Sequence, residues 1–276
     1  MKKTMVKAVE IFGVSLAATV FSAATMADGH GHSDEAVCSG FGPQTPRDID
    51  SLHGENNRAF SLAPDYEEMN LCNIHFHQNA EHKAKDFSIF AGEGDKKGIG
   101  GGYMCAISQG LSDAELKAPK KDICNGLMPG DTIEVHYVHS SCDVTPGPTL
   151  GACLSETCAN PDLRVETQVF TLVNDSSAMD FADYSYGGNK QGGLHQAKSL
   201  DFGTGAPVEF TGSTTGPSFN EQVCSPLQVS WSVRPQCAKL DINTVGKWCE
   251  SNVFNEDSAH GVRKLVVNPA LLSEID

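Results

Sequence analysis

The chain has 276 residues, of which 35 are acidic and 20 are basic, so its formal net charge at pH 7 is −15. This charge argues against a nucleic-acid partner and against an anionic membrane surface, because neither is attracted to an acidic protein. The length allows one large β or α/β domain or two small ones. No internal repeat or low-complexity linker divides the sequence.

Residues 1–27 have the order of a secretory signal peptide. Lysines at positions 2, 3 and 7 precede an apolar run from Ile11 to Ala24, and small residues follow. We expect cleavage after Ala27, with cleavage after Ala24 as the alternative. The run is short for a membrane span, and no later segment is apolar enough for one. The sequence therefore predicts an exported protein, periplasmic or secreted, with no membrane span and a mature charge of about −17, since three lysines and one glutamate are removed.

Residues 28–37 are expected to form a flexible polar tail, and residues 38–276 a single domain. Cleavage after Ala27 would leave Asp28, Gly29 and His30 at the new N-terminus. A free amine, two backbone amides and a third-position imidazole can form a square-planar site that suits Cu(II) or Ni(II). A polar tail without a metal is the alternative.

Short β-prone runs separated by Gly, Pro, Asn and Ser dominate the rest of the chain, which predicts a mostly β fold with few short helices. Helix signals are confined to SDAELK, where Ser112 and Glu115 form a capping pattern, and to KLDINTVGKWCE. The expected strands are NIHFH, FSIF, DTIEVHYVH, LRVETQVFTLV, PVEFT and LQVSWSV.

All ten cysteines follow the predicted cleavage site. An even number of cysteines in an exported chain indicates a disulfide framework. No C-x-x-C pair occurs, which argues against a thiolate zinc site. Proximity in sequence alone suggests the pairs Cys153 with Cys158 and Cys237 with Cys249.

Histidines alternate along two of the expected strands. His75 and His77 are two residues apart in CNIHFHQNAEHK, so an extended strand presents both on one face. In DTIEVHYVH, Glu134, His136 and Val138 share a face. If the two strands are neighbours, His136 can complete a three-histidine zinc site with an open fourth position. Glu134 would then suit the outer layer, where a ligand histidine donates its other ring N–H.

These segments resemble a known family. NIHFH with the EH that follows, and EVHYVH, are similar to the zinc-binding strands of α-type carbonic anhydrases. FTGSTTGPS is similar to the gatekeeper loop of that family, and VSWSV is similar to the strand after the loop. GPQTPRDID is similar to the N-terminal motif of the family. The matches extend from about residue 42 to residue 234. Glu81 lies four residues after His77 and Glu134 lies 53 after Glu81, and this spacing resembles the delta-class carbonic anhydrases and their bacterial relatives instead.

The resemblance implies a large central, mainly antiparallel β-sheet and zinc-dependent, reversible hydration of carbon dioxide to bicarbonate and a proton, by attack of a zinc-bound hydroxide. It implies zinc ligands at His75, His77 and His136, which Asn73 and Glu134 would orient. The gatekeeper hydroxyl would be Thr215, or Thr214 if the alignment shifts by one residue.

Further roles follow from the same resemblance. Glu81 would accept a hydrogen bond from the gatekeeper, Val138 would line the carbon dioxide pocket, and His82 and His139 would be structural. Cys38 would pair with Cys224 and tether the gatekeeper loop. Arg58 stands where many α-type enzymes have a proton-shuttling histidine, and arginine cannot be deprotonated. His53, His195 or buffer would then carry the proton.

A non-catalytic, exported metal-binding or interaction protein with the same fold is the alternative function. The histidine set favours zinc, although cobalt and cadmium take the same ligands. The expected partner is a small molecule, carbon dioxide or bicarbonate, and the sequence leaves the oligomeric state open.

Overall fold

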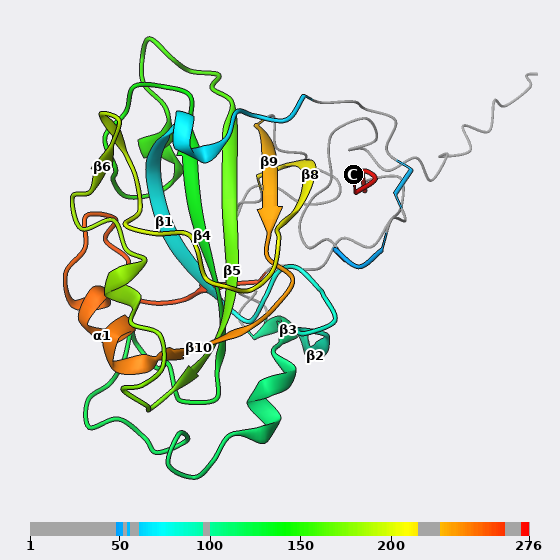
Figure 1. Cartoon of the computed structure of the whole chain (residues 1–276), viewed down its shortest axis with the longest axis vertical. Coiled ribbons are helices and arrows are strands. Elements are labelled where there is room, and N and C mark those ends of the chain that lie inside the picture. Colours follow the sequence, from blue (N-terminus) through cyan, green and yellow to red (C-terminus); the bar gives the residue numbers. More distant parts are fainter. Residues whose placement is uncertain are drawn as a thin grey trace, which may run out of the picture. The chain divides into compact units, whose positions relative to one another are not determined.

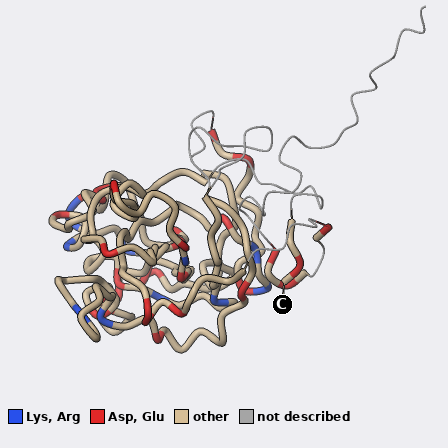
Figure 2. Tube along the Cα trace, turned by 90° about the horizontal axis from the view of Figure 1, so that it is seen from above, with Lys and Arg blue, Asp and Glu red and all other residues tan. Residues whose placement is uncertain are grey.

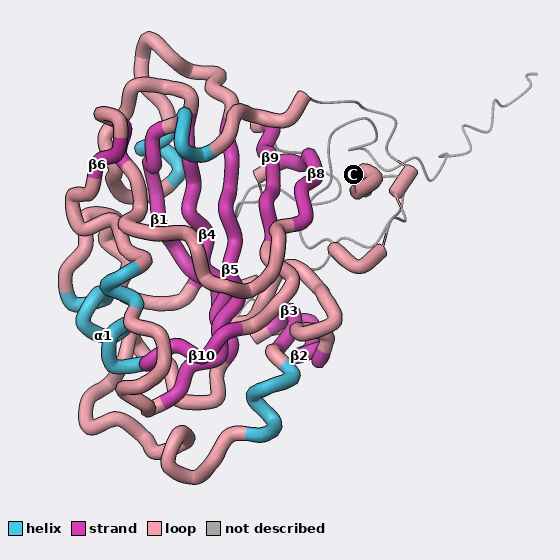
Figure 3. The backbone as a smooth tube through the Cα atoms, viewed as in Figure 1, coloured by secondary structure: helices cyan, strands magenta, loops and turns pink. Residues whose placement is uncertain are grey.

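The computed structural model describes residues 48–51, 54–55, 61–95, 100–214, 227–262 and 272–275. The chain divides into two units, residues 1–35 and 36–276, and all described residues belong to the second. Strands and loops make up most of this part (Figure 3). The strands are β1 (Asn70–Gln78), β2 (Ile89–Glu93), β3 (Gly101–Met104), β4 (Thr132–Ser140), β5 (Leu163–Val173), β6 (Lys190–Gln191), β7 (Leu194–His195), β8 (Val208–Ser213), β9 (Gln228–Val233), β10 (Ala238–Asp241) and β11 (His260–Gly261).

The described residues contain one α-helix, α1 (Ile242–Glu250), and four short 3₁₀ segments, η1 (Tyr66–Glu68), η2 (Ala106–Gly110), η3 (Leu150–Cys153) and η4 (Phe181–Asp183). None of the described helices is both long and apolar enough to cross a membrane. The mostly β class with few helices is therefore confirmed. Each β-prone run predicted from the sequence lies in or overlaps a strand.

Seven of the described strands form one sheet, in the order β11-β1-β4-β5-β9-β8, with β10 pairing to β5 beyond this path (Figure 1). The pairs β1–β4, β4–β5 and β8–β9 are antiparallel. The pairs β1–β11, β5–β9 and β5–β10 are parallel. The two long pairs at the centre of the sheet are antiparallel, as expected, and the parallel pairs make the sheet as a whole mixed. Strands β9, β10 and β11 enter it from distant parts of the chain.

One predicted helix is a single turn. In SDAELK the Leu116 N–H donates to the Ser112 carbonyl, and Ser112 and Glu115 form the reciprocal capping contacts. Pro119 follows closely and disfavours helical backbone in the residue before it, so the turn does not propagate. The second helix signal is confirmed as α1, where the Asp241 side chain accepts from the Asn243 N–H as an N-cap.

The central sheet is covered on both faces, which explains why every residue of β4 and β5 is buried. Side chains alternate between the faces. On one face, Phe76, Tyr137 and Phe170 pack in a core with Ile242 and Val245 of α1. The opposite face carries His75, His77 and His136, beside a second core that contains Val138, Val165, Val169 and Trp231.

The eight described cysteines form four disulfides, which indicates an oxidising compartment. The pairs are Cys72–Cys153, Cys105–Cys237, Cys124–Cys249 and Cys142–Cys158. The pairings Cys153–Cys158 and Cys237–Cys249, predicted from proximity, were therefore wrong. The cost of closing a loop rises only slowly with its length, so the packing of strands decides which cysteines meet.

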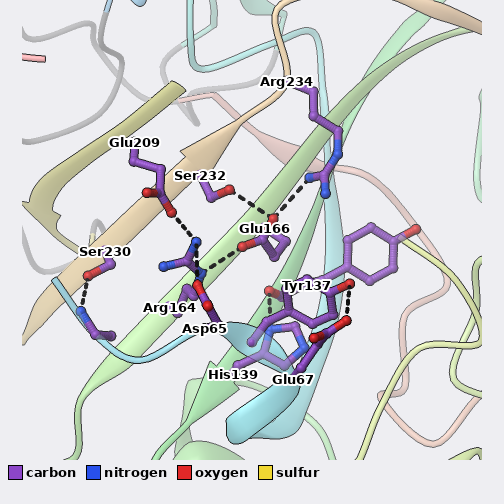
Figure 4. A network of polar contacts seen from close by, with 12 residues as sticks. Asp65, Glu67, Tyr137, His139, Arg164, Glu166, Glu209, Ser230, Ser232 and Arg234 are labelled. Atoms are coloured by element: carbon purple, nitrogen blue, oxygen red, sulfur yellow. Dashed lines mark hydrogen bonds and ion pairs between the residues drawn. The ribbon is translucent and has the colours of Figure 1, made fainter. Parts of the chain in front are cut away.

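A buried ion-pair network (Figure 4) lies on the face of the sheet opposite His75, His77 and His136. The Glu166 carboxylate accepts from Arg164 Nε at 2.7 Å, from Arg234 Nη1 at 3.1 Å and from the Ser232 hydroxyl at 2.8 Å. Arg164 also bonds to Glu209 on β8. The network joins β5, β9 and β8. Both guanidinium groups and Glu166 are buried, so the loss of one charge would leave its partner buried without compensation.

His139 is a fully buried structural histidine beside this network. Its Nδ1 lies 3.0 Å from the Tyr137 carbonyl, to which a neutral imidazole donates. Burial lowers the pKa of His139 from 6.5 to about 3, an effect that the bond to Tyr137 only partly opposes. The ring is therefore neutral in the folded protein at pH 7.

This pKa shift should make stability depend on pH. Between the two pKa values the unfolded chain binds a proton that the folded protein does not, so stability is complete above about pH 6.5 and decreases as the pH falls. The expected loss from this site between pH 6.5 and pH 4 is about 3 kcal/mol. Urea unfolding across this range should show a flatter decline in His139→Gln than in the wild type. His195→Gln, at a half-buried position, is the control, and an identical decline in wild type and His139→Gln would contradict the prediction.

Candidate metal centre

Three histidines meet on neighbouring strands because of the register between β1 and β4. His75 lies directly opposite His136 in the antiparallel pair, and His77 lies opposite Glu134. Residues opposed in this way have Cβ atoms about 5 Å apart. Each of the three histidines offers a ring nitrogen, and these atoms lie within 4.8 Å of one another. The predicted trio is therefore brought together.

A neighbouring side chain lies close to one ring nitrogen of each of the three histidines. His75 Nδ1 lies 2.7 Å from Asn73 Oδ1, so a proton on Nδ1 leaves Nε2 with its lone pair. His136 Nε2 lies 3.4 Å from a Glu134 oxygen, and His77 Nδ1 lies 3.4 Å from Glu81. These two distances exceed an ordinary N–H···O bond, and both nitrogens are buried without a hydrogen-bond partner. His75 Nε2 and His136 Nδ1 therefore face each other, on the sides of the rings away from Asn73 and Glu134.

Glu134 connects the histidines to the segment after β1 that carries Glu81. It is fully buried and accepts from the Glu81 backbone N–H at 2.6 Å, while His82 Nδ1 lies 2.6 Å from its other oxygen. Burial alone would raise the pKa of Glu134, but His82 and His136 outweigh burial and leave the pKa well below its ordinary value. The ionised carboxylate can therefore hold both imidazoles in orientation.

Burial also affects the three candidate ligand histidines themselves. It lowers the pKa of His77 to about 4, against the opposing effect of Glu81. For His136, burial lowers the pKa, but Glu134 more than offsets this effect and the pKa ends above its ordinary value. A neutral imidazole is the form that binds a metal, so His77 is held in the binding form.

One distance within the trio matches the separation of two ligands in a tetrahedral metal site. Zn–N bonds of about 2.0–2.1 Å at tetrahedral angles place two ligand nitrogens about 3.3 Å apart. His136 Nδ1 and His75 Nε2 are 3.3 Å apart. A second set of potential donors, His82, Glu134 and His136, is fully buried. In this set His82 already bonds to Glu134, and Glu134 lies 3.4 Å from His136, so the set supports the first one.

The three histidines open into a cavity of about 610 Å³. Apolar side chains form much of its wall, including Val138 as predicted, with Val165, Leu227 and Trp231. The segment 149–154 forms another wall, and the Cys72–Cys153 disulfide ties that segment to β1. The Asn73 side chain also donates to the Gly147 carbonyl, so one residue orients both His75 and the chain leading to this wall.

Several predicted residues lie outside the described part of the chain. They are Thr215, the pair Cys38 and Cys224, the tail residues Asp28, Gly29 and His30, and also His53 and Arg58. Of the two gatekeeper alternatives, Thr214 is described, is buried and lines the cavity together with Glu81. His195 is not among the described lining residues, and its Nδ1 lies 2.6 Å from the Tyr186 hydroxyl.

The sequence did not indicate two further residues of the cavity, His260 and Glu256. The His260 ring lies 5.3 Å from the His75 ring and 5.7 Å from the His77 ring, centre to centre, and its Nε2 lies 2.8 Å from Glu256. His260 comes to the site through the parallel pairing of β11 with β1, opposite His77. This strand is two residues long and has no periodicity that a sequence could reveal.

The fold and site together define a mixed β-sheet protein in which a three-histidine candidate metal centre lines a partly apolar cavity. The delta carbonic anhydrase family model matches residues 66–244, and the chain belongs to this family. The matched range contains β1 and β4 and all three histidines. No curated protein matches the chain. The further likeness to α-type motifs stays a prediction.

Proposed function

We propose that this protein catalyses the reversible hydration of carbon dioxide to bicarbonate and a proton, with a zinc ion held by His75, His77 and His136. The convergence of three ring nitrogens in the lining of the cavity, in a member of the delta carbonic anhydrase family, carries the proposal. Carbonic anhydrases are the established example of zinc as a Lewis acid that lowers the pKa of a water molecule to near 7.

The protein residues would prepare the site for this chemistry. Three neutral imidazoles leave the positive charge of a bound ion uncompensated, and Asn73 and Glu134 keep two of the rings in the binding orientation. Val138, Val165 and Trp231 exclude water and contact a nonpolar gas without a polar partner. Glu81 would accept a hydrogen bond from a gatekeeper threonine, Thr215 or Thr214, and so fix the direction of that hydroxyl.

The proposal includes an exported location, in the periplasm or outside the cell. The four disulfides of the described residues support an oxidising compartment, and residues 1–27 have the pattern of a signal peptide.

Stopped-flow measurement of carbon dioxide hydration tests the function, with the metal content of each sample determined in parallel. We expect hydration by wild-type protein that a chelator abolishes and zinc restores. His136→Ala should reduce the rate to that of buffer, because two histidines are too few for a catalytic zinc site. His195→Ala changes a histidine outside the cavity lining and should retain activity.

Buffer-level hydration by folded, zinc-loaded wild-type protein would refute the enzyme and leave a metal-binding protein of the same fold. Full activity in His136→Ala would refute the ligand set instead.

A further inference from the structure

A basic cleft lies between α1 and the segment 114–123, away from the residues of the metal centre. It has a volume of about 670 Å³. Four lysines and one glutamate are among its twelve lining residues, in a chain whose acidic residues outnumber its basic ones by 35 to 20. Figure 2 shows acidic residues spread along the described chain. The lining residues with charged side chains are Lys117, Lys120, Lys121, Lys247 and Glu250.

The walls of the cleft are fixed to each other. The Cys124–Cys249 disulfide joins the end of the segment to α1. Asn174 Nδ2 donates to the Lys117 carbonyl at 2.8 Å, and Asn243 on α1 donates to Asn174 Oδ1 at 3.0 Å. Gly246 allows close packing, since a Cβ there would lie 2.7 Å from Ile123 Cδ1. A ligand would therefore meet a cleft whose backbone is already in place, which lowers the entropic cost of binding.

Two of the nearby carboxylates bond to groups other than the lysines of the cleft. Glu115 bonds to Lys239, which lies outside the cleft lining, and Asp241 accepts from Asn243. Lys121 and Glu250 lie 3.5 Å apart, but both side chains are largely exposed, so water and salt screen the pair. Lysines gathered on a rigid frame repel one another, and an anion with several charges would relieve that repulsion.

We infer that this cleft binds a linear anionic polysaccharide through its sulfate or carboxylate groups. Its volume exceeds that of one small oxyanion and suits several sugar units. The described residues of its lining include no arginine and no aromatic residue, so they offer none of the planar forks and stacking surfaces that favour nucleic acids. Lysine ammonium groups attract anionic groups with little demand on direction. Ala118, Pro119 and Ile123 supply an apolar surface between them for the C–H faces of sugars.

Fluorescence anisotropy with a fluorescein-labelled heparin octasaccharide tests the inference on the full-length protein at low salt, with polygalacturonate as the carboxylate competitor. We expect saturable binding that either polysaccharide competes. Lys117→Gln/Lys120→Gln/Lys247→Gln should weaken binding about 10-fold or more, since each ammonium group contributes one screened ion pair. Lys85→Gln/Lys190→Gln/Lys198→Gln removes the same charge at exposed positions elsewhere and should change binding less than about 3-fold.

Thermal unfolding of both triple variants confirms that they are folded. Absence of binding by the wild type would overturn the inference, as would equal losses in the two triple variants. Duplex DNA or anionic lipid vesicles that bind as tightly as the polysaccharides, and lose binding in the cleft variant, would overturn the ligand class.

Discussion

Replacement of Glu134 by alanine is expected to lower the free energy of unfolding by about 3–5 kcal/mol, the cost of leaving buried polar partners without their carboxylate. Glu134 is fully buried between the Glu81 N–H, His82 Nδ1 and His136 Nε2. Metal affinity should fall about 10–100-fold as well, because His136 loses the group that orients its ring. Urea unfolding measures the first effect and competition with a chromogenic chelator measures the second.

Glu134→Gln is the matched variant. An amide of the same shape can still bond to the Glu81 N–H and to one imidazole, so its losses should be clearly smaller than those of alanine. His82→Gln removes only one of the three partners and should destabilise the protein while retaining more of the metal affinity. Equal metal affinity in wild type and Glu134→Ala would contradict the orienting role, whatever the change in stability.

Glu166→Leu should destabilise the protein by about 3–5 kcal/mol for a different reason. The substitution removes the carboxylate that accepts from Arg164, Arg234 and Ser232, and it leaves two guanidinium groups buried without this partner (Figure 4). Arg164 retains Glu209, so Arg234 should lose most. Urea unfolding at neutral pH measures the effect.

The triple variant Arg164→Met/Glu166→Leu/Arg234→Met removes all three charges together. Apolar side chains of similar volume are expected to restore stability to near the wild-type value or above it, because desolvation offsets the attraction within a buried network. A triple variant less stable than Glu166→Leu would show that the network contributes net stability. The network lies on the face opposite His136, so neither variant should change metal affinity.

Strand pairing and a disulfide bond both hold the residues around the cavity in place. Strands β1 and β4 provide a rigid register for the histidines, and the Cys72–Cys153 disulfide fixes a wall of the cavity to the same strand. Constraining the unfolded chain by such a bond contributes about 2–4 kcal/mol. Side chains on a strand buried on both faces are held more precisely than side chains on loops, which would suit the proposed metal centre.

Local geometry allowed the sequence alone to predict part of this protein. Alternation along an extended strand places His75 and His77 on the same face of one strand. It likewise places Glu134 and His136 on the same face of a second strand, independently of the rest of the chain. β-prone runs bounded by turn residues predicted β5 and β9, and the sequence also indicated a helix near α1. The predicted capping contact at Ser112 forms, but the helix there is only one turn long.

The tertiary structure decided everything that depends on partners distant in sequence. The register that puts His136 opposite His75 joins residues 61 positions apart, and the parallel entry of β11 brings His260 to the cavity. The cysteine partners and the parallel strand pairs likewise arise from burying both faces of one sheet. The pattern of a strand indicates which face of the sheet a residue occupies. Which residue lies opposite it depends on which strands pack together to exclude water, and no short stretch of sequence contains that information.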